Sequence, residues 1–315
     1  MPEVTCVGNI VADVVGRPID SLPERGRLLP VERIGLFAGG CGANTATGLA
    51  KLGVETALIG KIGRDGFGDF MAAHFAKAGI DTGGLIRDSA AATSATIVIG
   101  HADGERSFLH DVGANAALTL EDIDFERVRH SKILAVAGVF LMPAFDGEPM
   151  AELLKRAQAA GVMTVLDTAW DASGRWLDLL RPCLPYLDYF LPSFDEAVML
   201  TGGLENPQAI ADFFLASGVG TVGLKLGAQG CYVQSNRDAF SIPGLPAIAC
   251  DTLGAGNAFV AGFTAALARD WNLEQCGQFA CATGASAVSA VGATTGIKTF
   301  AETQAMMEAF YNRQD

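Results

Sequence analysis

Short apolar runs of strand length alternate with segments of helical spacing along most of this 315-residue chain. The alternation is most regular after Lys132. The strands predicted there are residues 132–137, 162–167, 188–191 and 219–226, and the helices are 149–160, 195–200 and 207–216. Strands that alternate with helices form a mostly parallel sheet covered on both faces. We therefore expect an α/β fold whose substrate lies at the carboxyl ends of the strands.

The two ends of the chain continue this alternation. In the N-terminal part, the predicted strands are residues 4–10 and 54–59, and the predicted helices are 43–52 and 67–78. Gly53 and Gly79 follow these helices directly, which is the usual place for a glycine that ends a helix. In the C-terminal part, two short strand-like segments, 231–234 and 239–242, precede helices at 256–268, 273–291 and 299–311.

Two neighbouring segments do not fit the alternation of strands and helices. Residues 93–100 and 105–110 alternate like strands, and a turn at 102–104 joins them. We interpret this hairpin, together with early strands, as a small β-sheet lid contributed by segments near 11–38 and 93–112. The lid would belong to a single domain of 315 residues and could cover a site.

Composition limits the classes of partner. The formal net charge is −13, which repels nucleic acid and anionic membranes. ATP would be repelled as well, so a phosphate site must be built locally from amides, a few cations and a metal ion. The seven cysteines contain no Cys-x-x-Cys pair, which favours a reducing, cytoplasmic location without disulfides or zinc. The first residues lack a basic region followed by a long apolar core, which argues against a signal peptide. The longest apolar runs have strand length, which argues against a membrane span.

The sharpest local signal is a glycine-rich turn just before the predicted helix 256–268. Gly254 and Gly256 let the chain turn sharply, so that backbone amides converge at the start of the helix. Such amides, helped by the helix dipole, form an anion site that can stabilise charge on a transferring phosphoryl group. The alternative is a plain helix N-terminus packed through glycine. Without further motifs this alternative is the better interpretation.

Further motifs are present. The segment from Asp251 to Phe259 resembles the C-terminal signature of ribokinase-like (PfkB) carbohydrate kinases, Asp-Thr-x-Gly-Ala-Gly-Asp-x-Phe, at eight of nine positions. Four other segments follow the family's order: Gly39-Gly40-x-x-x-Asn44, Gly60-x-x-Gly63-x-Asp65-x-Phe67-Gly68, Glu196-Ala197 with Leu200-Thr201-Gly202, and Leu226-Gly227-x-x-Gly230. The resemblance implies a ribokinase-like three-layer sandwich with a mostly parallel central sheet. It also implies ATP-dependent phosphorylation of a sugar hydroxyl.

The resemblance gives individual residues a role. Amides for the phosphoryl group would come from Gly254, Ala255 and Gly256, and position 257 would hold the base that takes the proton of the sugar hydroxyl. The sugar hydroxyls would be bound by Asp13, Gly39, Gly40 and Asn44. The nucleotide would lie against Lys225, Gly227, Gly230 and Thr252. Glu196 would order Mg²⁺ through water, and the carbonyls of Asp251 and Leu253 could hold a monovalent cation such as K⁺.

Several of these residues have a structural alternative. Asp13 could cap a turn, and Asn44 could cap a helix. Glu196 lies in a first helical turn, where the dipole favours any acid. Lys225 could be a surface lysine whose stem lies along apolar side chains.

Two positions depart from the family pattern. Ser193 stands where the acidic segment usually has asparagine, and its hydroxyl can still bind water around a metal ion. Asn257 stands in place of the catalytic aspartate, and a neutral amide cannot act as a general base. Since a general base contributes about 10²–10⁴-fold in rate, we expect a slow kinase that still binds its ligands. Asn257→Asp should then raise phosphoryl transfer at least ~10²-fold.

Two other functions compete with this one. The first is a pseudokinase that binds a sugar or nucleotide without catalysis. The second is an oxidoreductase that binds a dinucleotide. It requires Gly-x-Gly-x-x-Gly after the first strand, and the segment from Gly8 to Asp13 does not supply this pattern.

The resemblance leaves the acceptor open, because it covers kinases of ribose, fructose, keto-deoxy-gluconate, phosphorylated sugars and nucleosides. Five side chains could meet an anionic substrate group, although solvated surface charges are the favoured interpretation: Arg17, Arg27, Arg33, Arg106 and His110. Asp167, Arg175 and Trp176 resemble a segment of fructokinase-like members, with a solvated loop as an equal alternative. The lid could also pair between subunits, which makes a homodimer plausible.

Overall fold

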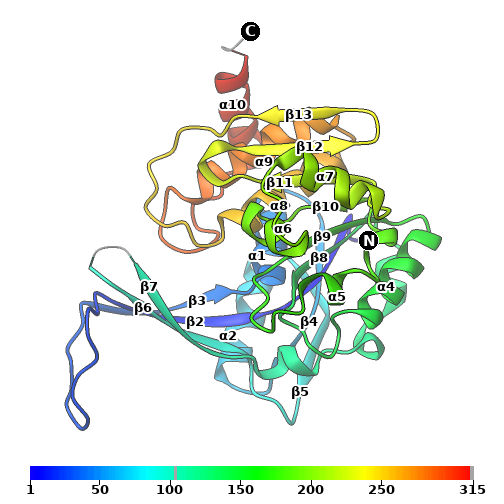
Figure 1. The fold of residues 1–315 in the computed structure, drawn as a ribbon. Helices are drawn as coiled ribbons and strands as arrows, with labels where there is room; N and C mark the ends of the chain where they lie inside the picture. Colours follow the sequence, from blue (N-terminus) through cyan, green and yellow to red (C-terminus); the bar gives the residue numbers. More distant parts are fainter. Residues whose placement is uncertain (103–104, 313–315) are drawn as a thin grey trace.

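The computed structural model describes residues 1–102 and 105–312, and its centre is a sheet of nine strands (Figure 1). In spatial order these are β13 (Ala239–Ile242), β12 (Cys231–Ser235), β11 (Thr221–Lys225), β10 (Tyr189–Phe190), β9 (Met163–Thr168), β8 (Ile133–Val139), β1 (Val4–Gly8), β4 (Thr56–Gly63) and β5 (Asp81–Asp88). The pairs β11–β12 and β12–β13 are antiparallel, and the other neighbouring pairs are parallel. The mostly parallel sheet predicted from the sequence is confirmed.

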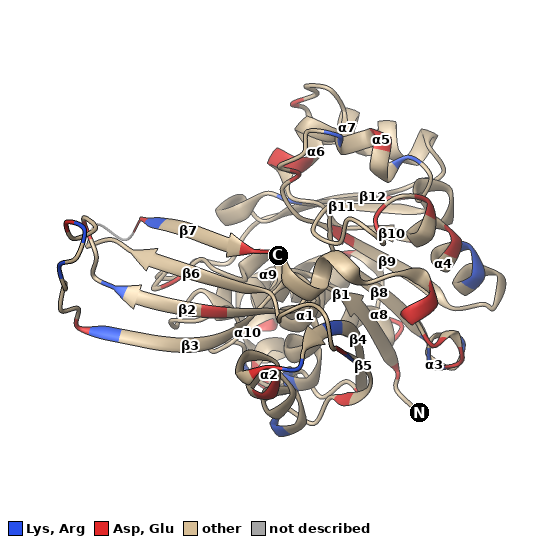
Figure 2. Ribbon diagram, turned by 90° about the horizontal axis from the view of Figure 1, so that it is seen from below, with Lys and Arg blue, Asp and Glu red and all other residues tan. Residues whose placement is uncertain are grey.

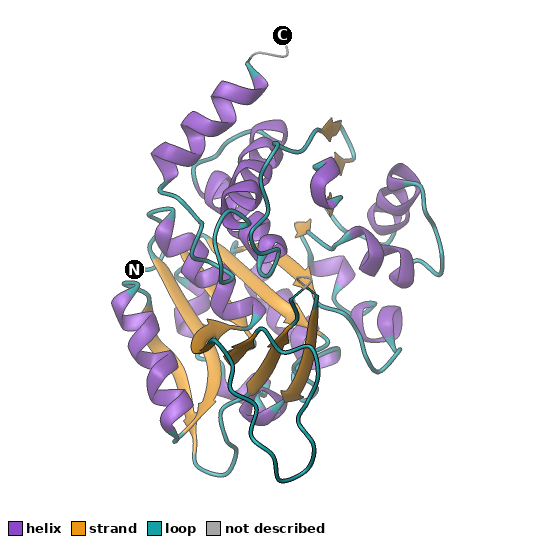
Figure 3. Ribbon diagram, turned by 90° about the vertical axis from the view of Figure 1, so that its left-hand side faces the viewer, coloured by secondary structure: helices purple, strands orange, loops and turns teal. Residues whose placement is uncertain are grey.

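Helices cover both faces of this sheet (Figure 3). The α-helices are α1 (Cys41–Lys51), α2 (Gly66–Lys77), α3 (Phe125–Arg129), α4 (Glu148–Ala159), α5 (Trp176–Leu180), α6 (Phe194–Leu200), α7 (Pro207–Ala216), α8 (Ala255–Ala268), α9 (Leu273–Ala287) and α10 (Phe300–Tyr311). Short 3₁₀ turns are η1 (Gly113–Ala117), η2 (Leu120–Asp122), η3 (Leu184–Tyr186) and η4 (Gly227–Gln229). Buried side chains form two clusters, one involving α1, α2, α8, α9 and α10 and the other α3 to α7. The expected three-layer sandwich is therefore confirmed.

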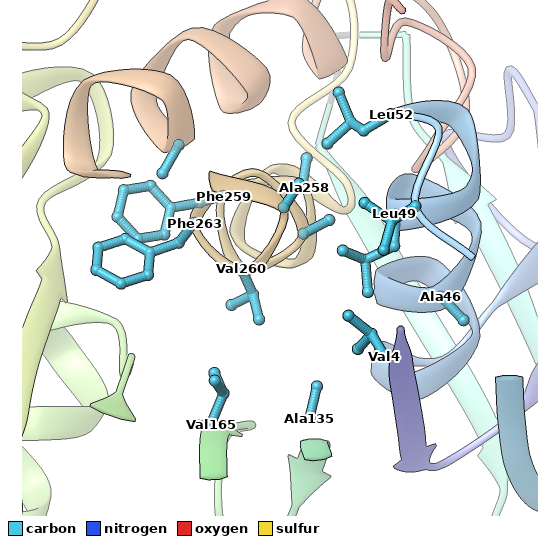
Figure 4. Close-up of a cluster of buried hydrophobic side chains, with 14 of the residues drawn as sticks. Val4, Ala46, Leu49, Leu52, Ala135, Val165, Ala258, Phe259, Val260 and Phe263 are labelled. Carbon is cyan, nitrogen blue, oxygen red and sulfur yellow. The ribbon is translucent and has the colours of Figure 1, made fainter. Parts of the chain in front are cut away.

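Helix α8 occupies the middle of one helical layer. Every residue from Ala258 to Ala268 in it is buried, because the sheet, α1 and α9 surround it. Figure 4 shows Val260 facing the strand residues Ala135 and Val165, with Phe259 and Phe263 on another side of the helix. A helix that is apolar all round is held by packing on every side. Its first turn is therefore fixed in position.

Four strands form a second, smaller sheet in the order β3 (Arg33–Gly39), β2 (Val11–Arg17), β6 (Ala95–Gly100) and β7 (Arg106–Asp111). β2 runs parallel to β6, and the other two pairs are antiparallel. In Figure 1 this sheet extends away from the main body at the lower left. It is the small β-sheet expected from the sequence, whose role as a lid stays a prediction, and we call it the lid sheet.

The structure differs from the sequence prediction at several element ends. The predicted strand 4–10 ends at Gly8, because the side chain of Asn9 turns to accept the amide of Cys41 across 2.9 Å. The predicted helix 273–291 ends at Ala287, followed by Ser289, whose hydroxyl donates to a carbonyl of the last turn. β5, α3 and α5 were not predicted. Part of the predicted turn at 102–104 lies outside the described residues.

Charged residues are spread over helices, loops and strands of the lid sheet in the view of Figure 2. Acidic residues outnumber basic ones, 35 to 22. Among the described residues, the helices are too short or too polar to cross a bilayer.

Candidate active site

A cavity of about 1050 Å³ opens at the carboxyl ends of β9 and β11, beside the first turns of α6 and α8. Its lining includes most of the catalytic, nucleotide and metal positions expected from the sequence: Glu196, Lys225, Gly227, Gly230, Thr252, Gly254, Ala255, Gly256 and Asn257. The cavity therefore lies at the edge of the sheet where the sequence predicts a substrate site.

The turn into α8 leaves backbone amides free. Gly254 has a left-handed φ of 78°, which glycine adopts without a steric penalty. Within the described chain, the amides of Gly254, Gly256 and Asn257 donate to no protein acceptor. The amide of Ala255 differs from the expectation, because it donates to the carbonyl of Thr252 across 3.3 Å. The amides that can converge on an anion are thus those of Gly254, Gly256 and Asn257.

The side chain of Asn257 connects the two sides of the site. Its amide nitrogen donates to Oδ2 of Asp167 across 3.3 Å, and its oxygen accepts from the amide nitrogen of Asn44 across 3.4 Å. Asn44 and Asn257 are 213 positions apart in the sequence. The position assigned to the base therefore lies next to a position assigned to the sugar.

Asp167 is the site residue that sequence reasoning left undecided. It lies at the carboxyl end of β9, only 1% exposed, and pairs with Lys225 at the end of β11. The solvated loop is therefore wrong for Asp167, and the surface lysine is wrong for Lys225. The available signal was an acid directly after the apolar pair Val165 and Leu166, at the end of a predicted parallel strand.

The Asp167–Lys225 pair has shifted proton affinities. Burial raises the pKa of Asp167 to about 6, while the charge of Lys225 lowers it. Burial lowers the pKa of Lys225, but the negative charges of Asp167 and Glu196 together raise it by more than burial lowers it. The net shift of the Lys225 pKa is therefore upward. At neutral pH both members of the pair are therefore charged.

Glu196 is placed by a capping box at the start of α6. The side chain of Ser193 accepts the amide of Glu196, and Oε2 of Glu196 accepts the amide of Ser193 across 3.0 Å. Oε2 also accepts the hydroxyl of Thr168 across 2.9 Å. Oε1 accepts no hydrogen bond from the described residues. Glu196 lines the cavity, and its free carboxylate oxygen can accept a hydrogen bond from a water molecule of a hydrated Mg²⁺ ion.

The predicted sugar-binding residues lie where β2, β3 and α1 meet. Asp13 is 9% exposed, and burial raises its pKa to about 6, although a hydrogen bond with Thr96 lowers it. A Cβ atom at Gly39 would collide with the Asp13 carboxylate, so only glycine leaves room for it. Gly40 has φ of 92° and precedes α1, which carries Asn44. Asp13 also lines a small hollow of about 30 Å³ next to the lid sheet.

The predicted nucleotide side is a loop between two strands. Gly227 and Gly230 bracket η4 with φ of 60° and 99°, and a Cβ atom at Gly230 would collide with the carbonyl of Ile242. The wall that continues from this loop is built of small and apolar side chains, among them Leu226, Leu245, Ala247, Ala285 and Val288. Such a wall can bury a planar base.

Asp251 connects the lid sheet to the turn before α8. Its Oδ1 accepts from Arg106 of β7 across 2.5 Å and from the amide of Leu253 across 2.8 Å. Its Oδ2 accepts the amide of Gly292 across 2.9 Å. Within the described chain, the backbone carbonyls of Asp251 and Leu253 accept no hydrogen bond. This connection was not predicted.

The other candidate cations lie away from the cavity. Arg17, Arg27 and Arg33 are exposed, and so is His110, whose ring nitrogen bonds to the hydroxyl of Thr96 across 3.0 Å. These four agree with the solvated interpretation. Arg106 is the exception, because it is partly buried against Asp251.

Comparison with known proteins gives one consistent result. The profile of the pfkB family of carbohydrate kinases matches residues 1–299. A ribokinase of Haemophilus influenzae is 31% identical over 315 residues, which cover 97% of this chain and 98% of that protein. A ribokinase of Thermotoga maritima superposes with a TM-score of 0.85 at 27% identity, over 98% of this chain and 100% of that one. A ribokinase of Arabidopsis thaliana, complexed with ribose and ATP, superposes with a TM-score of 0.86 at 26% identity, over 98% of this chain and 99% of that one. The chain therefore belongs to the pfkB family of carbohydrate kinases and has the ribokinase-like fold.

Proposed function

We propose that this chain transfers the γ-phosphoryl group of ATP to a hydroxyl of a sugar or sugar derivative. The observation that carries the proposal is the set of free amides at Gly254, Gly256 and Asn257 beside the ammonium of Lys225. Nζ of Lys225 lies 3.5 Å from the place that a Cβ of Gly256 would occupy. Amides and an ammonium aimed at one place stabilise the charge that develops in phosphoryl transfer. The ribose and ATP of the Arabidopsis structure support the same reaction.

The acceptor would lie between the lid sheet and α1, held by Asp13, Asn44 and the backbone at Gly39 and Gly40. Its hydroxyl would then attack the γ-phosphorus in line with the bond that breaks. Glu196 would hold Mg²⁺ through water, and bound Mg²⁺ supplies positive charge to the phosphates.

The loop before α8 also offers a cation site. We propose that the free carbonyls of Asp251 and Leu253 hold a monovalent cation such as K⁺. A cation there would add positive charge behind the amides that face the phosphate. The reducing, cytoplasmic setting expected from the cysteines suits a kinase that draws on cellular ATP.

The test is ADP release with a broad panel of sugars, in the parent chain and in Asn257→Asp. We expect the aspartate form to be at least ~10²-fold faster with one sugar class, because a carboxylate at position 257 acts as a general base. If no sugar accelerates ADP release in either form, the kinase proposal is wrong.

The alternative is a pseudokinase that binds sugar and nucleotide without turnover. The neutral amide of Asn257 at the base position is the observation that favours it. It predicts that ATP and a sugar raise the unfolding temperature, while both forms stay inactive. A thermal-shift series followed by the ADP assay separates the two functions.

The outer face of the lid sheet suits a second copy of the chain. Val14 pairs with Leu36 on one side and Ile97 on the other, and Ile97 pairs with Leu109. Because side chains alternate along a strand, this row points away from Asp13. Leu36, Ile97 and Leu109 are 37%, 51% and 59% exposed. We propose that this row is the contact of a homodimer.

A further inference from the structure

A carboxylate remains next to the position where the base is missing. Oδ2 of Asp167 lies 3.3 Å from the amide nitrogen of Asn257, and Asp167 lines the same cavity as Gly254 and Gly256. The site has thus lost the carboxylate at position 257 but keeps one within a single hydrogen bond of it. The sequence expectation of a site without a base did not include this neighbour.

We propose that Asp167 accepts the proton of the acceptor hydroxyl in this chain. The inference rests on the proposed kinase function. The bond from the hydroxyl oxygen to the γ-phosphorus forms while the bond from that phosphorus to the bridging oxygen breaks, and the electron pair leaves with ADP. The hydroxyl proton passes to Oδ2 of Asp167 and reaches solvent after product release. Asn257 has a second N–H, which can orient the hydroxyl oxygen.

The other charged and titratable groups that face Asp167 cannot take this role. They are Lys225 from β11, Glu196 from α6 and Cys41 from α1. Lys225 is a cation without a free lone pair. Burial raises the pKa of the Cys41 thiol to about 12, so the thiol stays protonated. Two hydrogen bonds to Oε2 hold the carboxylate of Glu196 at the start of α6, and its other oxygen, Oε1, is the one assigned to a water molecule of hydrated Mg²⁺.

Lys225 couples the basicity of Asp167 to the nucleotide. Its ammonium pairs with Asp167 and lies beside the free amides at the start of α8. A triphosphate on those amides attracts the same ammonium, which weakens its hold on Asp167. The carboxylate then becomes a better proton acceptor when ATP is in place. Its pKa of about 6 is already close to neutral, where a general base works best.

The test is a double-mutant cycle with Asp167→Asn and Asn257→Asp, measured by ADP release. In the parent chain, Asp167→Asn should lower turnover at least ~10-fold, because it removes the carboxylate that lies next to the amide of Asn257. In the Asn257→Asp background it should change turnover less than ~3-fold, because the new aspartate takes the proton. A carboxylate that merely holds Lys225 would lower turnover equally in both backgrounds. Equal losses overturn the inference.

The pH profile gives a second readout. kcat of the parent chain, measured at saturating sugar and ATP so that acceptor binding by Asp13 does not contribute, should rise with pH as Asp167 loses its proton. The same rise should be absent in Asp167→Asn. If it persists there, another group is the base.

Two further variants distinguish a loss of the base from a general loss of stability. Asp146→Asn is the matched control, because Asp146 is also buried with a pKa raised to about 6 by burial and does not line the cavity. It should leave kcat unchanged. Asp167→Glu keeps a carboxylate and should retain more turnover than Asp167→Asn, with both variants checked for a native unfolding temperature. If Asn257→Asp is active but Asp167→Asn does not change the turnover of the parent chain, only this inference fails. If no form is active, the proposed function fails.

Discussion

At the scale of single residues, two glycines share a left-handed backbone but differ in the space around them, so alanine at each site tests these two constraints separately. Gly254 before α8 and Gly53 after α1 have similar positive φ values of 78° and 74°. A Cβ atom at Gly254 would lie 2.5 Å from Cβ of Ala293, whereas a Cβ atom at Gly53 meets nothing within 4 Å. Gly254 is therefore required both by its left-handed φ and by the close contact with Ala293, whereas Gly53 is required only by its left-handed φ.

Gly254→Ala should lower the free energy of unfolding by more than ~2 kcal/mol, because the contact with Ala293 adds to the left-handed backbone cost. It should also reduce ADP release, since the amides at the start of α8 move. Gly53→Ala should cost ~1–2 kcal/mol, from the left-handed backbone alone, and leave activity intact. Urea denaturation measures both variants. Equal losses would show that the loop before α8 relaxes around the new side chain.

Residue roles could be predicted only where a motif or a strand end marked them. The motif that contains Asn44 and the motif that contains Asn257 come from distant segments, and the structure joins them by one hydrogen bond. The ion pairs Asp167–Lys225 and Arg106–Asp251 could not be predicted from the sequence, because the residues of each pair are at least 58 positions apart. Such pairs depend on which strand ends meet. That is a property of the sheet order, which no local pattern encodes.

At the scale of elements, Asp65 ties α2 to the entry of the lid sheet. It caps α2 by accepting the amide of Gly68 across 2.8 Å. It also accepts the amide and the hydroxyl of Thr93, across 2.7 Å and 2.8 Å, just before β6. Thr93 is buried, so its amide has no access to water. One carboxylate therefore satisfies donors from two elements.

Asp65→Ala should lower the free energy of unfolding by ~2–4 kcal/mol. The loss combines a helix cap, worth ~1 kcal/mol, with the buried amide of Thr93 left unpaired, worth ~1–3 kcal/mol. Asp124→Ala is the control, because Asp124 caps α3 at an exposed position and should cost only ~1 kcal/mol. Chemical denaturation compares them. A similar small loss in both would mean that Thr93 finds another acceptor.

Most elements were predictable because their residues are buried on both sides of the sheet. β1, β4 and β8 are buried throughout and, apart from Thr5, Thr56 and Lys61, appear in the sequence as apolar runs. β5 was missed because its sequence, DTGGLIRD, is polar at both ends and rich in glycine. Only pairing with β4 makes it a strand. Tertiary pairing overrides local preference at such an edge.

At the scale of the whole molecule, we expect two copies of the chain to bury an apolar row of the lid sheet between them. The row consists of Leu36, Val14, Ile97 and Leu109. Ile97→Asp should therefore shift the chain from dimer to monomer, because a charge in an apolar contact is costly. Sedimentation velocity measures the mass. Ile248→Asp is the control, because Ile248 is 90% exposed on a loop outside the lid sheet. If the parent chain is already a monomer at micromolar concentration, the lid contact is not a dimer interface.

The bond between Arg106 and Asp251 would affect how the proposed kinase uses ATP. Asp251 also holds the amides of Leu253 and Gly292, so the lid and the approach to α8 share one carboxylate. Any swing of the lid away from the body must release this arginine and loosen the approach. In the proposed kinase, a raised lid over an empty acceptor site would leave the amides before α8 less well ordered, so that water would attack the γ-phosphate of ATP less readily. The same lid movement that would admit the sugar would therefore disfavour hydrolysis of ATP in the absence of an acceptor.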